Sequence, residues 1–375
     1  MSDAFDVVIA GAGIVGAACA RECAARGLRT AVVEPCEIGG GATAAGMGHI
    51  VVMDDSPAQL ALTSYSQRLW NELSRQLPSS VEYESCGTLW VASDEEEMQE
   101  VHRKQALYAS VGVATEVLDS RALAEAEPNL RRPLAGALRV PSDAVLYPPC
   151  AAEYLLQEAV RKGVQIYAGR RVLSARAGKV YLDDNSELRA ESIVNAGGAD
   201  ATALLPELPI RKRKGHLVIT DRYPGFVHHQ LVELGYLKSA HSVNTDSVAF
   251  NIQPRKTGQV LIGSSRQYGS EDSSVDHQIV SAMIERARCF MPDIGGLSAI
   301  RIWTGFRAAT PDKLPLIGPW PEDSTLFLAA GHEGLGITTS LGTAQLLADY
   351  LAGGKTKIPI DPYLPKRFVR SAAHA

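Results

Sequence analysis

Hydrophobic and polar positions in the first 34 residues follow a pattern that predicts a strand, a helix and a second strand. Residues 5–10, FDVVIA, form a short, largely apolar run, as is typical of a strand buried on both faces. Residues 14–26 are rich in helix formers, and Gly27 follows as a candidate C-cap. The segment 29–34 is again largely apolar and ends at Glu34. The chain is therefore expected to open on a strand–helix–strand unit.

The turn between the first strand and the helix fits the pattern G-x-G-x-x-G. In such a turn Gly11 allows the tight bend, Gly13 lets the backbone approach a pyrophosphate, and Gly16 lets the helix pack on the strand. The free N–H groups and the dipole of the helix N-terminus favour phosphate. Glu34 stands where a carboxylate can accept the hydroxyls of an adenosine ribose. These residues predict a dinucleotide site, with a structural turn that binds no ligand as the alternative.

Three later segments carry other signals. The stretch 38–49 is so rich in glycine and alanine that we expect its backbone to lie close to a flat ligand, with a flexible surface loop as the alternative. The segment 128–149 contains five prolines and is expected to connect two domains. The basic run 211–216 is expected to be a solvated turn, with a partner surface as the second interpretation.

The remaining periodicity predicts strands and helices in both halves of the chain. The strands between 217 and 265 are separated by turn residues, which favours an antiparallel sheet and a second domain. A buried strand at 325–330, a glycine turn and a final helix repeat the order of the opening. Other helices are expected at 57–77, 151–162 and 278–290, with a charged, exposed helix at 94–111, and other strands at 87–92, 164–167, 171–173, 192–199 and 301–307.

Composition narrows the function classes. The chain has 375 residues, a net charge of −5 and a pI near 6.0. It therefore lacks the excess of positive charge that favours nucleic-acid binding, and we expect no nucleic-acid partner. No run of 18 apolar residues could cross a bilayer, and the N-terminus lacks a basic signal-peptide region, so the expected compartment is the cytoplasm. The six cysteines are scattered without a C-x-x-C pair, so we expect no metal site and no iron–sulfur cluster.

Several motifs together resemble the D-amino-acid oxidase family of flavoproteins, which includes glycine oxidase and sarcosine oxidase. Besides the first glycine motif and Glu34, they are Gly41-Ala42-Thr43, Asn195-Ala196-Gly197, Trp303-Thr304-Gly305-Phe306-Arg307, Thr310-Pro311-Asp312, Pro315-Leu316-Ile317-Gly318 and Gly331-His332-Glu333-Gly334-Leu335-Gly336. The resemblance covers nearly the whole chain. The family tract after the arginine usually carries proline where Ala308 stands here, which puts the local turn in question.

The resemblance implies FAD and an α/β fold: a Rossmann-like FAD-binding domain built from discontinuous segments, plus a substrate domain with a large mixed or antiparallel sheet. We expect the FAD-binding domain at 1–80, 145–215 and 300–375, and the substrate domain at 81–144 and 216–299.

A narrower resemblance is to the flavin-bearing β subunits of multi-subunit dehydrogenases, among them those of hydrogen cyanide synthase, opine oxidase and D-hydroxyproline dehydrogenase. It rests on the tracts 235–239, 248–255 and 258–266, which look most like the hydroxyproline member. It implies oxidation of an amino or imino acid at the α-carbon by hydride transfer to flavin N5, with companion subunits. The alternatives are a stand-alone glycine or D-amino-acid oxidase that uses oxygen, and a nucleotide-binding interaction subunit without chemistry. The exact substrate, the covalent state of the flavin and the stoichiometry stay open.

The resemblance also assigns site residues. It places Arg307 at the family's carboxylate-binding arginine, with a structural salt bridge as the alternative. Tyr236 is a candidate pocket wall, and His332 and His49 are candidates for contact with substrate or flavin, although an ordinary structural role is open for all three. Expected to contact the cofactor are Gly11, Ala12, Gly13, Ile14, Val15, Gly16, Glu34, Ala42, Thr43, Met47, Gly48, His49, Val172, Ala196, Gly197, Gly331, Gly334, Leu335, Gly336 and Ile337.

Overall fold

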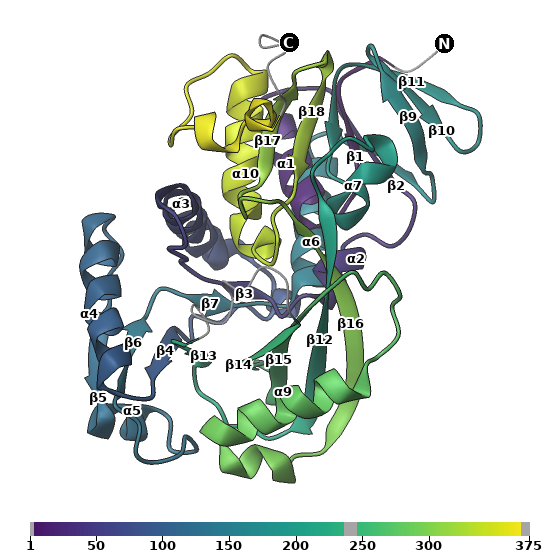
Figure 1. Cartoon of the computed structure of the whole chain (residues 1–375). Coiled ribbons are helices and arrows are strands. Elements are labelled where there is room, and N and C mark those ends of the chain that lie inside the picture. Colours follow the sequence, from purple (N-terminus) through teal and green to yellow (C-terminus); the bar gives the residue numbers. More distant parts are fainter. Residues whose placement is uncertain (1–3, 236–245, 369–375) are drawn as a thin grey trace, which may run out of the picture.

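The computed structural model describes residues 4–235 and 246–368 and contains two large β-sheets with helices packed around them (Figure 1). Each sheet has eight strands within the described residues, and a two-stranded ribbon of β3 (His49–Ile50) and β7 (Ala144–Val145) forms a third, small sheet. The expected α/β class with a Rossmann-like part and a large mixed sheet is confirmed. Within the described residues, no helix is both long and apolar enough to cross a membrane.

The first sheet is built around β1, which lies between β11 and β2, and all three run parallel. Strands β8 and β18 extend the parallel arrangement on either side, and β17 closes one edge in the antiparallel sense. The strands are β1 (Ala4–Ala10), β2 (Thr30–Glu34), β8 (Gln165–Ala168), β9 (Val172–Arg176), β10 (Lys179–Leu182), β11 (Glu187–Asn195), β17 (Leu316–Trp320) and β18 (Asp323–Ala330).

Residues of β1 enter two separate cores, one on each face of this sheet. Val7 and Ile9 pack with α1 (Ile14–Ala25), α6 (Pro148–Val160), α10 (Gly336–Leu351) and α3 (Pro57–Leu73). Phe5 and Val8 face the opposite core, which includes the short helix α7 (Ala201–Leu204) and the β9–β10 hairpin. The sheet is therefore covered on both sides, as its apolar strands require.

The second sheet has the order β16-β12-β15-β14-β13-β4-β6-β5. Its pairs are antiparallel except β13 with β4. Helix α9 (His277–Phe290) covers one face, and α4 (Glu95–Ser110) and α5 (Ser120–Ala126) lie at the β4–β6–β5 end (Figure 1). The strands are β4 (Thr88–Ala92), β5 (Glu116–Asp119), β6 (Gly136–Val140), β12 (Arg211–Arg222), β13 (Gln230–Glu233), β14 (Ser247–Pro254), β15 (Gln259–Tyr268) and β16 (Ala299–Ala309).

The basic run 211–216 is not a solvated turn, and that prediction is wrong. It is the first half of β12, and Arg213, Lys214 and His216 are all buried. Arg213 forms an ion pair with Glu333, and the Lys214 ammonium lies 3.3 Å from Asp272. These buried positive charges are tolerated because acidic side chains from distant segments of the chain neutralise them.

Other local predictions also change. The proline-rich segment 128–149 contributes β6 and β7 rather than only a connection, and the glycine-rich stretch 38–49 contains the short helix α2 (Gly41–Ala45). Two of the expected domain boundaries can be compared with the sheet to which the strands there belong. The boundary at 215/216 falls inside β12, and the range 300–375 includes most of β16, although both strands belong to the second sheet. The division into an FAD-binding and a substrate domain otherwise stays a proposal.

Helix α4 is not fully exposed, because it buries Val101, Tyr108 and one charged side chain, Lys104. Lys104 is 0% exposed, its ammonium pairs with the buried carboxylate of Asp54, and it lies 4.6 Å from the ring centroid of Trp90 and 5.3 Å from that of Tyr108. The Tyr108 hydroxyl donates to the Val52 carbonyl at 2.9 Å. These contacts fasten α4 to the chain segment that follows β3 and to the second sheet.

We predict that Lys104→Met lowers the free energy of unfolding by about 3–5 kcal/mol, because the Asp54 carboxylate would stay buried without its ammonium partner. Urea unfolding followed by circular dichroism measures the effect. Arg103→Met on the same helix is the control: it removes the second, half-exposed partner of Asp54 but leaves the buried Lys104–Asp54 pair intact, so we expect a loss below about 1 kcal/mol. A Lys104→Met protein as stable as the parent would contradict the structural role of the pair.

Candidate cofactor and substrate site

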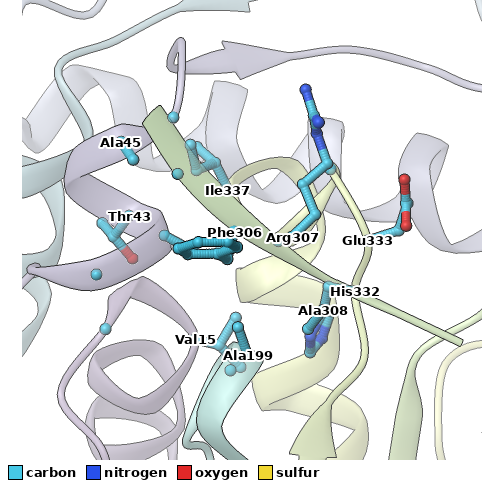
Figure 2. A pocket seen from close by; sticks show the side chains of 18 of the residues that line it. Val15, Thr43, Ala45, Ala199, Phe306, Arg307, Ala308, His332, Glu333 and Ile337 are labelled. Atoms are coloured by element: carbon cyan, nitrogen blue, oxygen red, sulfur yellow. The ribbon is translucent and has the colours of Figure 1, made fainter. Parts of the chain in front are cut away.

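A cavity of about 630 Å³ lies where the carboxyl ends of β1, β2 and β11 meet one face of the second sheet. The end of a parallel sheet is where ligands bind in open α/β folds. Figure 2 shows part of the lining: Arg307 and Phe306 on β16, the turn that carries His332 and Glu333, and Thr43 and Ala45 of α2. The cavity thus brings together motifs from the start, middle and end of the chain.

The first glycine motif forms a backbone cradle at one end of this cavity. Gly11 has a φ of +110°, and a Cβ there would lie 2.7 Å from the Ala196 carbonyl oxygen. A Cβ on Gly16 would lie 2.0 Å from the Gly11 carbonyl oxygen. These contacts leave no room for a side chain, so the turn can bend over the sheet and present the α1 N-terminus to the cavity. The cradle suits the diphosphate of a dinucleotide.

Glu34 lines the cavity at the end of β2 and also braces the glycine turn. One carboxylate oxygen accepts a hydrogen bond from the Ala12 backbone N–H at 2.6 Å, and the other accepts from the Cys36 N–H at 2.9 Å. The sequence pattern indicated the ribose but not this bond across the motif. Glu34 can therefore serve two purposes, holding the turn and facing a ligand.

Helix α2 supplies a second contact that holds the glycine turn and the start of α1. The Thr43 hydroxyl oxygen accepts from the Ile14 N–H at 3.1 Å, which satisfies one of the free donors at the start of α1. A Cβ on Gly13 would lie 3.3 Å from the same hydroxyl. The Met47 carbonyl accepts from the Gln253 side-chain amide at 2.7 Å, and this bond joins the segment after α2 to β14.

Most residues expected to contact the cofactor line this one cavity. Four of them do not, and two of these four have a clear packing role instead: Gly48, where a Cβ would lie 1.9 Å from the Leu146 carbonyl oxygen, and Gly16. Ala12 and Gly331 also lie outside the lining. Those that line it are Gly11, Gly13, Ile14, Val15, Glu34, Ala42, Thr43, Met47, His49, Val172, Ala196, Gly197, Gly334, Leu335, Gly336 and Ile337.

Both candidate histidines line the cavity; His332 is buried and His49 is partly buried. Burial lowers the pKa of His332 to about 4, and its Nε2 lies 3.0 Å from the Thr343 hydroxyl of α10. Burial and, to a smaller extent, the nearby Arg307 guanidinium lower the pKa of His49 to about 4, opposed by a hydrogen bond to the Gly334 backbone. Both imidazoles are therefore neutral at physiological pH. Tyr236, the third candidate, lies outside the described residues.

Arg307 reaches into the cavity from β16. One of its terminal nitrogens donates to the Ser265 carbonyl at 3.0 Å. Its guanidinium lies directly over Gly215 of β12, where a Cβ would be 2.5 Å from the same nitrogen. A side chain at position 215 would push the guanidinium away, so the glycine fixes where the charge lies. Ala308, which stands where the family usually has proline, accepts from the Glu333 N–H at 2.8 Å, so β16 remains joined to the turn before α10.

The motifs did not identify the floor of the cavity, which is the face of the second sheet opposite α9. Trp90, Val232 and Asn251 line it from three neighbouring strands, β4, β13 and β14. Asn251 is a polar residue inside the apolar run of β14, and this was the one signal in the sequence that could have indicated a cavity-facing position. The described residues contain no group of three or more His, Cys, Asp or Glu that could hold a metal ion.

Comparison with known proteins agrees with this geometry. The chain is 30% identical to glycine oxidase from Geobacillus kaustophilus, and the alignment covers 98% of each chain. It is 29% identical to hydrogen cyanide synthase subunit HcnC from Pseudomonas aeruginosa, and the alignment covers 98% of this chain and 97% of that protein. The crystal structure of glycine oxidase from Geobacillus kaustophilus superposes with a TM-score of 0.87 at 27% identity and covers 98% of this chain and 100% of that one.

The family model described as FAD dependent oxidoreductase matches residues 6–350, which is most of the chain. The glycine cradle, the α1 N-terminus and Glu34 are the features that this cofactor would need at its adenosine diphosphate end, so the residues present fit FAD. The expected resemblance to the D-amino-acid oxidase family is confirmed, and the chain belongs to this family of FAD-dependent oxidoreductases.

Proposed function

We propose that this chain oxidises a cyclic D-imino acid, best a 4-hydroxy-D-proline, at its α-carbon to give an imine, and that it works as the flavin subunit of a heteromeric dehydrogenase. The broader activity, FAD-dependent oxidation of an amino or imino acid at a CH–NH or CH–NH2 bond, follows from the family. The observation that carries the proposal is Arg307, whose guanidinium lies in the same cavity as the glycine cradle.

Arg307 is proposed to bind the substrate carboxylate. A guanidinium presents a planar fork that grips a carboxylate through two hydrogen bonds, and it keeps its charge at any physiological pH. The contacts to Ser265 and Gly215 hold the side chain in place before substrate arrives. A carboxylate fixed there would orient the adjacent Cα–H, and correct orientation is a large part of rate enhancement in such reactions.

Bound FAD supplies the acceptor for the hydride that leaves the substrate α-carbon. The N-terminus of α10 points its free N–H groups and its positive dipole end toward the cavity, where they would stabilise negative charge on a reduced cofactor. His332 and His49 are neutral and are proposed to contribute hydrogen bonds and shape, not charge. The substrate would react as the neutral amine, so we assign no side-chain base.

Two observations support a partner for electron transfer. One relative that matches the chain nearly end to end is named as a subunit of hydrogen cyanide synthase. The six cysteines of this chain lie apart in the sequence, without the spacing that holds an iron–sulfur cluster. Electrons are therefore proposed to pass to companion proteins.

We predict that Glu34→Ala weakens FAD binding by about 1.5–3 kcal/mol, because the variant loses charged hydrogen bonds to the ribose. Fluorescence titration of the apoprotein with FAD measures the loss. Glu37→Ala is the matched control, since Glu37 lines the same cavity but is exposed, and it should bind FAD as the parent does. Unchanged affinity in Glu34→Ala would refute the assignment.

We predict that Arg307→Ala reduces kcat/KM for the imino acid by about a hundredfold or more, because it removes the charged partner of the carboxylate. The flavin absorbance spectrum should stay the same. Arg301→Ala, an exposed position on the same strand, should retain full activity. Parental turnover by Arg307→Ala would rule out the role.

The substrate and the electron acceptor are tested together by stopped-flow reduction of the isolated holoprotein. We expect anaerobic reduction of its FAD by 4-hydroxy-D-proline to be faster than by glycine or sarcosine, and reoxidation in air to be much slower than reoxidation by an artificial dye. Faster reduction by glycine would overturn the substrate. Reoxidation by oxygen at the rate of turnover would make the chain a stand-alone oxidase.

A further inference from the structure

The cavity floor contains one row of side chains that cross-strand pairing places next to each other. Trp90 is paired with Val232, Val232 with Asn251, and Asn251 with Gly263. Paired residues of adjacent strands point to the same face of a sheet, so the three side chains share the face that borders the cavity. Trp90, Val232 and Asn251 all line it.

Two polar atoms in this row have no hydrogen-bond partner in the described part of the chain: the indole nitrogen of Trp90 and the amide oxygen of Asn251. Trp90 is only 2% exposed, so its N–H is shielded from bulk water. A buried polar group without a partner costs free energy, and such groups in native proteins usually await a ligand or an ordered water. The indole can only donate and the amide oxygen can only accept, whereas a hydroxyl can do both.

The row ends on the strand next to the one that Arg307 contacts. Arg307 donates to the Ser265 carbonyl on β15, and Asn251 is on β14, the next strand. Ser265 is two residues beyond Gly263, the residue paired with Asn251. Arg307 and Asn251 both line the same cavity, so one small substrate with a carboxylate and a hydroxyl can contact both.

The indole of Trp90 is also held in place by a charged side chain that contacts its ring. The Lys104 ammonium lies 4.6 Å from its ring centroid and is itself paired with Asp54. A cation over the ring face favours one ring orientation, and the surrounding apolar side chains fill the space around it. The N–H direction is therefore fixed before a ligand binds, which is what selective recognition requires.

We propose that Asn251, assisted by Trp90, is the specificity-determining residue of this enzyme and binds a hydroxyl on the substrate, at the end away from its carboxylate. The inference rests on the proposed function and names the side chains that select its substrate. A site built to hydrogen-bond a hydroxyl rejects an analogue that lacks it far better than an apolar pocket can. Without that recognition the cavity would accept the unsubstituted ring equally well.

The experiment compares anaerobic flavin reduction of the holoprotein by 4-hydroxy-D-proline and by D-proline. The parent should prefer the hydroxylated ring. Asn251→Leu keeps the size but loses the acceptor, and Trp90→Phe keeps an aromatic ring but loses the N–H. Each should lower kcat/KM for 4-hydroxy-D-proline by about fivefold to tenfold more than it lowers kcat/KM for D-proline, as expected for loss of one hydrogen bond. Flavin absorbance confirms that each variant has folded.

Val232→Ala is the control, because Val232 lies between the two residues but cannot form a side-chain hydrogen bond; it should affect both substrates equally. Equal loss on both substrates in Asn251→Leu and Trp90→Phe would overturn the inference while the proposed function stands. If neither ring reduces the flavin, the proposed substrate fails, and D-serine and D-alanine replace them. A preference for D-serine that Asn251→Leu removes would then uphold the inference, and no such preference would overturn it.

Discussion

Close approach of three backbone segments at the end of β1 is the constraint on which the whole structure depends. The turn of the glycine motif, the first turn of α1 and the end of β11 come so near to one another that Gly11 and Gly16 leave no space for a Cβ. Because the segments meet there, α1 lies flat on the sheet, its N-terminus opens into the cavity, and α6 and α10 can pack on it. The second sheet is then positioned across the same opening.

The first sheet was largely predictable because its signals are local. The strand, glycine turn, helix and acidic residue of the opening occur within a few dozen residues, and the apolar run 325–330 with its glycine turn repeats them. The brace from Glu34 to Ala12 was not predictable in the same way, since a pattern identifies a residue type and position but not a second use of the same carboxylate.

The basic segment 211–216 shows why the second sheet was harder to predict. Lys214 and Arg213 resemble solvated residues when only their neighbours in the chain are considered. Their acidic partners, Asp272 and Glu333, come from segments that reach them only after the sheet has formed. Lys104 presents the same difficulty, because Asp54 neutralises it from outside its helix.

In the site, too, residues within a sequence motif could be predicted, whereas residues brought together by strand pairing could not. Arg307 stands in a family motif and could be assigned from it. Asn251 and Trp90 became neighbours of the cavity only through the register of β4, β13 and β14, which no single stretch of sequence specifies. Motifs therefore identified the groups shared across the family, whereas the residues proposed to distinguish substrates required the pairing of strands.

The order of strands in the first sheet has a consequence for biosynthesis. β1 leaves the ribosome before the other strands of this sheet, yet it is flanked by β11, and β11 in turn pairs with β18, which ends at Ala330. Helix α10, which packs against α1, is completed only at Leu351. The apolar faces of β1 and α1 are therefore fully covered only after Leu351 has been translated. Such a nascent chain exposes aggregation-prone surface for longer than one whose domains close in sequence order, and it depends more on chaperones.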